Sequence, residues 1–137
     1  MNPFHYAFKV KDIESTRQFY VDILGCKEGR STEHWIDFDF FGHQLSAHVS
    51  ANIPEPDYCG QVAGISVPVP HFGCLLSYEQ FDQVRDRLVQ HAIPFVVEPY
   101  TRYEGQVGEQ RTMFILDHSK NPLEFKAFKN QDEVFAS

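Results

Sequence analysis

The sequence predicts an α+β fold made of two similar β-α-β-β-β modules, and two observations carry that prediction. The segments HYAFKV and HFGCLL, which begin at His5 and His71, look like copies of one strand. Each is followed by an amphipathic helical pattern and then by alternating segments, which is the signature of an internal repeat. At 137 residues the chain has the size of one domain. We therefore expect a single domain, residues 1–137, in which module one spans about residues 1–66 and module two about residues 67–137.

The elements of the first module follow from its apolar pattern. Residues 4–10 alternate between two faces, as a half-buried strand does. Asp12 then stands where a helix N-cap is expected, and Gly25 stands where that helix would end. Two or three strands follow, over residues 26–29, 34–41 and 43–49.

The second module repeats this order after residues 50–70, whose prolines and glycines predict a linker or a meandering loop. Its predicted elements are a strand at 71–76, a helix at 78–92 capped by Ser77, strands at 95–100, 111–117 and 122–128, and a polar tail. Neither small sheet could bury both faces alone. Pairing the modules would therefore give a curved sheet with helices outside and a concave interior with room for a ligand.

Two histidines and a glutamate are candidate metal ligands. The residue two positions after each histidine is small, Ala7 after His5 and Gly73 after His71, which leaves space beside each imidazole for a metal or a substrate. Glu124 points away from its apolar neighbours, and a carboxylate on a concave face would need a cation. Such a set is a reason to expect metal chemistry. On spacing alone, ordinary backbone-bonded histidines and a solvated glutamate remain open alternatives.

Two further residues are candidates for proton transfer. His48 shares a strand face with Gln44 and Ser46, from which it could bind a metal or assist a bound group. Tyr103 lies in a polar segment, residues 100–110, that could close over a site and place its hydroxyl as a proton donor. A plain exposed hairpin is the alternative for this segment.

Composition excludes several classes of function. The formal net charge is −7 and no run of lysine or arginine occurs, which argues against a protein that follows phosphate backbones. No apolar stretch is long enough for a signal peptide or a membrane span. The three cysteines form no C-x-x-C pair, which fits reduced thiols. We expect a cytoplasmic protein that acts on a small molecule and binds neither nucleic acid nor membrane.

Three segments in this order resemble the vicinal oxygen chelate superfamily, which includes glyoxalase I, bleomycin and fosfomycin resistance proteins and extradiol dioxygenases. The segments are HYAFKVKDIESTRQFYVDILG, VPHFGCLLSYEQFDQVRDRLVQHAIPF and FILDHSKNPLEFKAF. The last is similar to the family's D-P-x-G-N-x-x-E ending through Asp117, Asn121 and Glu124, while residues 118–120 vary. Within the superfamily, the chain looks most like small predicted extradiol-type dioxygenases.

The resemblance implies a glyoxalase-like fold with a divalent metal held by His5, His71 and Glu124, and a substrate chelated through adjacent oxygens. Glyoxalase I proteins take a fourth ligand, usually a carboxylate or glutamine, from the strand where this chain has His48. Three ligands suit non-haem Fe(II). We therefore expect an Fe(II) extradiol ring-cleavage dioxygenase, with His48 as general base or as donor to a bound oxygen.

Two other functions stay open. A glyoxalase-like isomerase or transferase would use Ni, Zn or Mn and no oxygen. A binding protein of the bleomycin-resistance kind would sequester a ligand without metal or turnover. Because members of the superfamily often dimerise, we also expect a homodimer, with sites built either within a chain or across the subunit interface.

Overall fold

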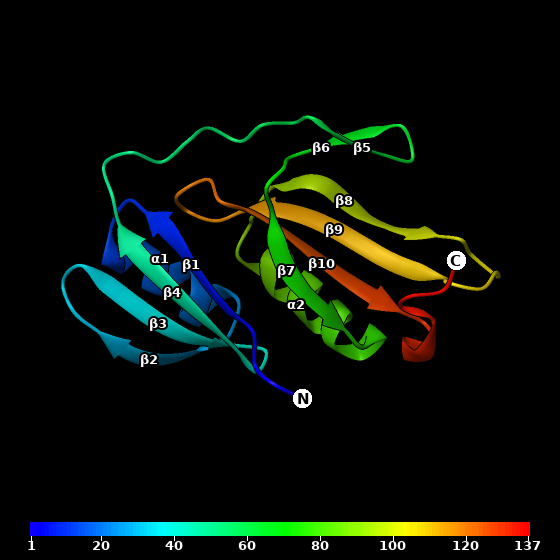
Figure 1. Ribbon diagram of the computed structural model, residues 1–137, viewed down its shortest axis with the longest axis horizontal. Coiled ribbons are helices and arrows are strands. Elements are labelled where there is room, and N and C mark those ends of the chain that lie inside the picture. The colour runs from blue at the N-terminus through cyan, green and yellow to red at the C-terminus, as the bar shows by residue number, and fades with distance from the viewer. The chain divides into compact units, whose positions relative to one another are not determined.

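The computed structural model describes all residues, 1–137, and contains two four-stranded sheets and a two-stranded hairpin (Figure 1). The chain divides into two compact units. Unit 1 contains residues 1–55 and 117–121, and unit 2 contains residues 56–116 and 122–137. The predicted α+β class is confirmed. None of the helices combines the length and the apolar character that crossing a bilayer would take.

Unit 1 contains one sheet, in the order β1-β4-β3-β2, and one helix. Its strands are β1 (His5–Val10), β2 (Lys27–Ser31), β3 (Trp35–Phe40) and β4 (His43–Val49). The helix begins as α1 (Ile13–Arg17) and continues as the π-helical segment η1 (Gln18–Ile23). The pair β1–β4 is parallel, and the pairs β2–β3 and β3–β4 are antiparallel. The strands and the helix that the sequence predicted for this part of the chain all form.

The helix of unit 1 covers one face of its sheet and leaves the other to polar side chains. Asp12 caps the helix as predicted, because its carboxylate accepts a hydrogen bond from the Ser15 amide at 2.7 Å. Tyr20 is fully buried, and its ring lies 5.7 Å from that of Phe8 and 5.1 Å from that of Phe38. Residues that alternate with these on the strands therefore face away from the helix.

Unit 2 contains the second four-stranded sheet, in the order β7-β10-β9-β8, and a longer helix. Its elements are the strands β7 (Phe72–Leu76), β8 (Phe95–Arg102), β9 (Gln110–Leu116) and β10 (Pro122–Phe128), the helix α2 (Tyr78–Gln90) and the short 3₁₀ turn η2 (Gln131–Glu133). The hydroxyl of Ser77 accepts from the Gln80 amide while the Gln80 side chain accepts from the Ser77 amide, a capping box that starts α2. Helix α2 packs on β10 and β7, where Leu123 and Phe125 are fully buried.

Residues 50–70 contain more structure than the predicted loop. The strands β5 (Gly60–Val62) and β6 (Ile65–Val67) pair as an antiparallel hairpin. Val67 joins Val97 and Phe114 in a buried apolar cluster. The prolines that suggested a loop all lie outside the two short strands, where no ladder hydrogen bond is needed from them.

The turn between β9 and β10, residues 117–121, is the segment of the second module that belongs to unit 1. We call it the Asp117 loop. One carboxylate oxygen of Asp117 accepts from the Tyr20 hydroxyl at 2.8 Å, and the other accepts from the amides of Ser119 and Asn121, both at 2.8 Å. Burial raises the pKa of the Asp117 carboxyl and also that of the Tyr20 hydroxyl.

Further contacts tie the Asp117 loop to the end of β1. The Lys11 amide donates to the Ser119 hydroxyl at 2.9 Å, and the Asn121 side chain donates to the Lys9 carbonyl at 2.7 Å. The ring of His118 packs edge-on against Phe19 at 5.2 Å. The Asp117 loop therefore provides hydrogen-bond partners for backbone groups at the end of β1.

Candidate metal centre

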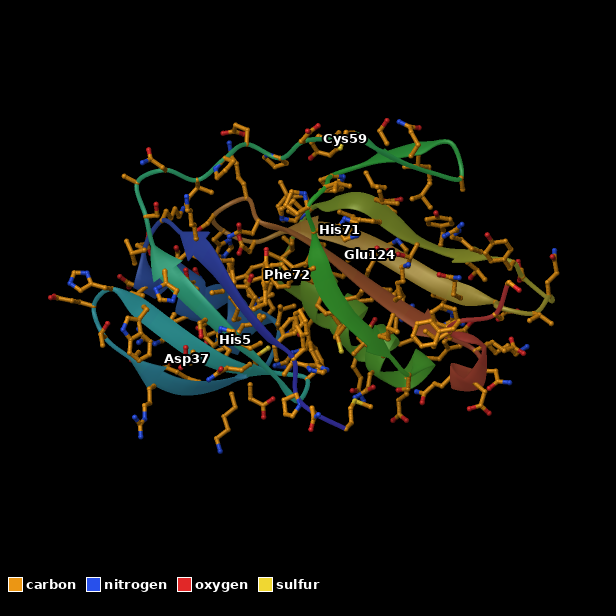
Figure 2. The ribbon with its side chains drawn as sticks, viewed as in Figure 1. His5, Asp37, Cys59, His71, Phe72 and Glu124 are labelled. Atoms are coloured by element: carbon orange, nitrogen blue, oxygen red, sulfur yellow. The ribbon has the colours of Figure 1, made fainter.

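A histidine and a glutamate from neighbouring segments of unit 2 form a close pair. The His71 Nε2 atom lies 3.1 Å from Glu124 Oε1, and the two side chains are 26% and 11% exposed. His71 Nδ1 lies 2.6 Å from the Pro68 carbonyl oxygen, to which it donates. Figure 2 shows His71 at the start of β7 and Glu124 on the adjoining β10. The backbone bond at Nδ1 orients the ring so that Nε2 is the atom offered to Glu124 or to a metal.

Hydrogen bonds shift the pKa values of His71 and Glu124 in opposite directions. The pKa of His71 is raised, mainly by its hydrogen bond to Glu124, although burial acts in the opposite direction. Burial raises the pKa of Glu124, but hydrogen bonds from His71 and from the Thr112 hydroxyl, 2.5 Å from Oε2, bring it below its usual value. His71 and Glu124 would hold a divalent cation in place of the proton that they share.

Gly73 is small for a different reason from the one predicted. A Cβ built on Gly73 would lie 1.5 Å from the carbonyl oxygen of Glu124. The missing side chain therefore allows the backbones of β7 and β10 to approach each other, where the sequence had suggested free space beside the imidazole. Gly73 also lines a pocket together with His71. Its contact with β10 was not predicted because the sequence shows one strand and not its partner.

The pair lines a pocket of about 240 Å³ in unit 2. Its other lining residues are Phe72, Gly73, Cys74, Leu75 and Lys126. Lys126 Nζ lies 4.0 Å from Glu124 Oε2 and is the cationic side chain in this lining. The pocket thus combines two metal-ligand types with one positive charge and apolar walls.

His5, on the open face of the unit 1 sheet, is held in a similar way. Its Nδ1 lies 2.8 Å from Gln44 Oε1, the strand neighbour with which it is in register. Because the amide oxygen can only accept, Nδ1 is the donor of this hydrogen bond, and Nε2 is the ring atom left for a metal. The sequence had left open that His5 is bonded to the backbone. In the structure its partner is the side chain of Gln44.

His48 lies farther along the same strand pair. It is exposed and in register with Lys9, four residues beyond the level at which His5 pairs with Gln44. At about 3.3 Å per residue, this places His48 roughly 13 Å from His5 along the sheet. Gln44 is therefore the β4 side chain beside His5. The alternation in the sequence placed Gln44 and His48 on one face of β4 but did not show which of the two lies next to His5.

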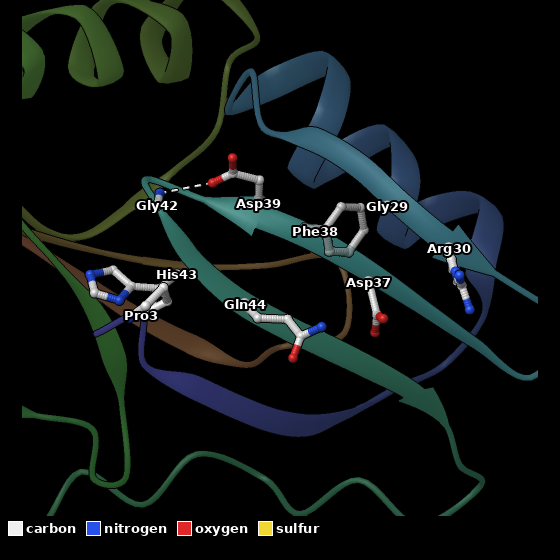
Figure 3. Close-up of a pocket in the computed structure, with 9 residues that line it drawn as sticks. All are labelled: Pro3, Gly29, Arg30, Asp37, Phe38, Asp39, Gly42, His43 and Gln44. Carbon is white, nitrogen blue, oxygen red and sulfur yellow. Dashed lines mark hydrogen bonds between the residues drawn. The ribbon is translucent and has the colours of Figure 1, made fainter. Parts of the chain in front are cut away.

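The same face of unit 1 carries a second pocket, of about 430 Å³ (Figure 3). Its lining residues are Pro3, Gly29, Arg30, Asp37, Phe38, Asp39, Gly42, His43 and Gln44. Both aspartates already have partners, because Asp37 accepts from the Ser46 hydroxyl at 2.6 Å and Asp39 from the Gly42 amide at 2.8 Å. These polar residues were not singled out from the sequence, although the alternation in WIDFDF places them opposite the core.

Tyr103 lies in the turn after β8 and is half exposed. The Arg102 guanidinium lies 5.0 Å from the centre of its ring and donates to its hydroxyl at 3.2 Å. Tyr103 is six residues beyond Val97, which pairs with Phe114 at the level of Glu124. That spacing is roughly 20 Å along the sheet. The structure does not bring Tyr103 to the His71–Glu124 pair.

The segment around Tyr103 is anchored by Glu109. The Gly105 amide donates to Glu109 Oε1 at 2.9 Å, and the Tyr78 hydroxyl donates to Oε2 at 2.8 Å. Desolvation and the hydrogen bond to Glu109 raise the pKa of Tyr78 to about 12. These contacts fasten the hairpin to the start of α2.

Neither unit by itself gathers three histidine, cysteine, aspartate or glutamate side chains into a metal-binding group. His71 and Glu124 form their pair within unit 2, and His5 belongs to unit 1. The imidazole and carboxylate donors of the pair fit a divalent metal of the first transition series.

Comparison with known proteins gives one consistent result. Residues 3–125 match the family described as the Glyoxalase/Bleomycin resistance protein/Dioxygenase superfamily. A curated relative, the metallothiol transferase FosB of Lysinibacillus sphaericus, is 27% identical over 133 residues, which cover 95% of this chain and 84% of the relative.

Solved structures agree in fold. A glyoxalase/bleomycin resistance protein/dioxygenase from Alicyclobacillus acidocaldarius is 32% identical, with a TM-score of 0.79 and coverage of 98% of this chain and 96% of the other. The fosfomycin resistance protein FosX from Listeria monocytogenes is 19% identical, with a TM-score of 0.73 and 97% coverage of both chains. The latter similarity concerns the fold alone.

Proposed function

Since this chain belongs to the glyoxalase/bleomycin resistance protein/dioxygenase superfamily, we propose that it is an enzyme whose divalent metal is bound by His5, His71 and Glu124. The observation that carries this proposal is the His71–Glu124 pair, with His71 Nδ1 bonded to the Pro68 carbonyl. Metal-bound histidines usually donate their other ring N–H to such an oxygen. His5 has the same arrangement, with Gln44 as the acceptor.

The metal would act as a Lewis acid that chelates a small substrate through adjacent oxygens. The residues of this chain hold the ligands ready for it. Thr112 fixes one carboxylate oxygen of Glu124, and Pro68 fixes the ring of His71. Ligands restrained in this way lose little conformational entropy when a metal or a substrate arrives.

For the reaction, we propose addition of a thiol to an electrophilic carbon of the chelated substrate. The sulfur–carbon bond would form as a carbon–oxygen bond of the substrate breaks, and the released oxygen would take up the proton that the thiol loses. The similarity to a metallothiol transferase over 95% of the chain supports this reading. It favours the alternative of a transferase, with a metal such as Mn(II), over the Fe(II) ring-cleavage dioxygenase expected from the sequence. Oxygen uptake separates the two, because ring cleavage consumes oxygen and thiol transfer does not.

The metal site is tested by titrating the metal-free protein with Mn²⁺ and following the free ion by electron paramagnetic resonance. We expect His71→Ala to weaken Mn²⁺ binding at least tenfold, because it removes one of the proposed ligands. His34→Ala is the matched control, since the side chain of His34 is 78% exposed. Equal Mn²⁺ affinity in the wild type and in His71→Ala would show that the site is assigned wrongly.

Thr112 gives a second prediction, on positioning. Thr112→Val keeps the shape of the side chain but removes the hydroxyl that donates to Glu124. We expect Mn²⁺ binding to weaken about tenfold, the usual effect of losing a hydrogen bond to a metal ligand. Thr112→Ser should restore the affinity. If the serine and valine variants bound Mn²⁺ equally, the hydroxyl would have no positioning role.

The remaining predictions concern proton transfer and assembly. The roles predicted for His48, as general base, and for Tyr103, as proton donor, stay predictions that His48→Gln and Tyr103→Phe variants that keep the metal would test. Because Tyr103 lies roughly 20 Å along the sheet from the His71–Glu124 pair, we do not propose direct proton transfer from it to a group bound there. Turnover unchanged in either variant would remove that residue from the mechanism. The homodimer and the cytoplasmic location stay predictions, and a sedimentation measurement tests the first.

A further inference from the structure

Unit 1 has another pocket, of about 230 Å³, beside the Asp117 loop. We call it the Lys11 pocket. Its lining residues, all of which belong to unit 1, are Lys11, Ile53, Pro54, Glu55, His118, Ser119 and Lys120. None of these residues takes part in the function proposed above. The lining combines basic groups and a hydroxyl with an apolar pair.

Several hydrogen-bond donors of the Lys11 pocket have no acceptor in the protein. Ser119 is 7% exposed, and its hydroxyl accepts from the Lys11 amide at 2.9 Å while its own O–H donates to no protein group. The Lys11 ammonium and the His118 ring nitrogens also make no hydrogen bond within the protein. Asp12 lies near both side chains, but it caps α1 and does not line the pocket. These donors are therefore available to a ligand.

Lys120 adds a second ammonium group from a fixed stretch of backbone. Its amide donates to the Asp117 carbonyl at 3.0 Å, and its φ of 64° lies in the left-handed region. The Lys120 ammonium lies 3.5 Å from Glu55 Oε1, and the two side chains are 64% and 78% exposed. An ion pair as exposed as this one contributes little to stability. A more highly charged anion could therefore take the place of Glu55.

The chemistry of these donors matches a phosphate group. A phosphate monoester carries nearly two negative charges at neutral pH and has three strong acceptor oxygens. Two lysine ammonium groups balance that charge, and the Ser119 hydroxyl is a neutral donor beside them. The pocket has room for several water molecules at about 30 Å³ each, which is more than the phosphate group alone needs. Ile53 and Pro54 offer an apolar surface to the rest of the ligand.

We propose that the Lys11 pocket binds a small organic molecule through its phosphate group. Lys11, Lys120 and the Ser119 hydroxyl hold the phosphate. The apolar part of the ligand lies on Ile53 and Pro54. This site needs no metal, so the ligand should bind the metal-free protein. Binding should also raise the unfolding temperature, because a ligand that binds only the folded state stabilises it.

The test titrates phenyl phosphate into the metal-free, ¹⁵N-labelled protein and follows the backbone amides by NMR. We expect the amide shifts to gather at Lys11 and at residues 118–120. Replacing both lysines, by Lys11→Met with Lys120→Met, should weaken binding at least tenfold, the effect of losing at least one charge-assisted hydrogen bond. Glu55→Gln should instead tighten binding, because it removes the carboxylate that competes for Lys120.

Lys9→Met is the matched control for the lysine variants. Lys9 is an exposed lysine of β1 that does not line the pocket, so its replacement should leave the affinity for phenyl phosphate unchanged. Circular dichroism of each variant checks that the fold is retained. Equal affinity in the wild type and in the double lysine variant would overturn the proposal. Amide shifts confined to residues 71–75 and 122–126 would also overturn it, since they would place the anion elsewhere.

Inorganic phosphate is the second probe, and it separates the phosphate contacts from the apolar ones. We expect it to shift the same amides as phenyl phosphate but to bind more weakly, because it cannot use Ile53 and Pro54. Equal affinity for the two probes would overturn the role of this apolar surface and leave free phosphate as the ligand.

Discussion

Replacement of Gly73 by alanine is expected to destabilise the protein by about 3 kcal/mol, the upper part of the range for overpacked positions. The added Cβ would lie 1.5 Å from the carbonyl oxygen of Glu124, and no side-chain rotation can relieve an overlap between two backbone segments. The strands β7 and β10 would have to separate where His71 meets Glu124. Metal affinity should therefore fall together with stability.

Gly29→Ala is the matched control for this substitution. Gly29 also lies on a strand, and its Cβ would meet the Asp37 side chain and carbonyl at 3.4 Å, close to ordinary contact. We expect a change within about 1 kcal/mol for this control. Urea unfolding followed by circular dichroism gives both values. Equal stability of the two variants would mean that β7 and β10 do not approach as closely as described.

The second large effect is expected at Asp117. Its carboxylate accepts from the Tyr20 hydroxyl and from two backbone amides of the Asp117 loop. Asp117→Ala would leave these donors without an acceptor in a buried environment, and unsatisfied buried groups cost about 1 to 3 kcal/mol each. We expect a loss of about 3 kcal/mol. Amide hydrogen exchange should show the loss in unit 1, where residues 117–121 belong.

Two further variants control the Asp117 result. Tyr20→Phe removes a single hydrogen bond of the carboxylate and should cost about 1 kcal/mol. Asp22→Ala removes an exposed aspartate from the helix of unit 1 and should change stability by less than about 0.5 kcal/mol. A loss in Asp117→Ala no greater than in Asp22→Ala would contradict the anchoring role.

Local patterns in the sequence were sufficient for most elements of the fold. The alternation of HQLSAHV placed a strand at residues 43–49, and β4 occupies those residues. The caps Asp12 and Ser77 start their helices as predicted, because a cap is decided by residues three or four apart. Glu124 also faces away from Leu123 and Phe125, which are fully buried.

Features that depend on which strands are neighbours were not predictable in this way. Thr112 reaches Glu124 only because β9 pairs with β10 in a particular register. Gln44 meets His5 for the same reason, through the pairing of β4 with β1. The reason for Gly73 was misread because the atom it accommodates belongs to another strand. A single sequence shows which face a residue takes, but not its neighbour across the sheet.

The position of the Asp117 loop has a consequence for how a duplicated gene segment can become a protein. The sequence predicts residues 1–66 as one copy of the repeat, yet the buried hydroxyl of Tyr20 finds its acceptor in residues 117–121, which the prediction assigns to the other copy. The repeated segment in the sequence and the self-sufficient folded piece are therefore not the same stretch of chain. A fragment that ends after the first copy would therefore leave the Tyr20 hydroxyl without its acceptor.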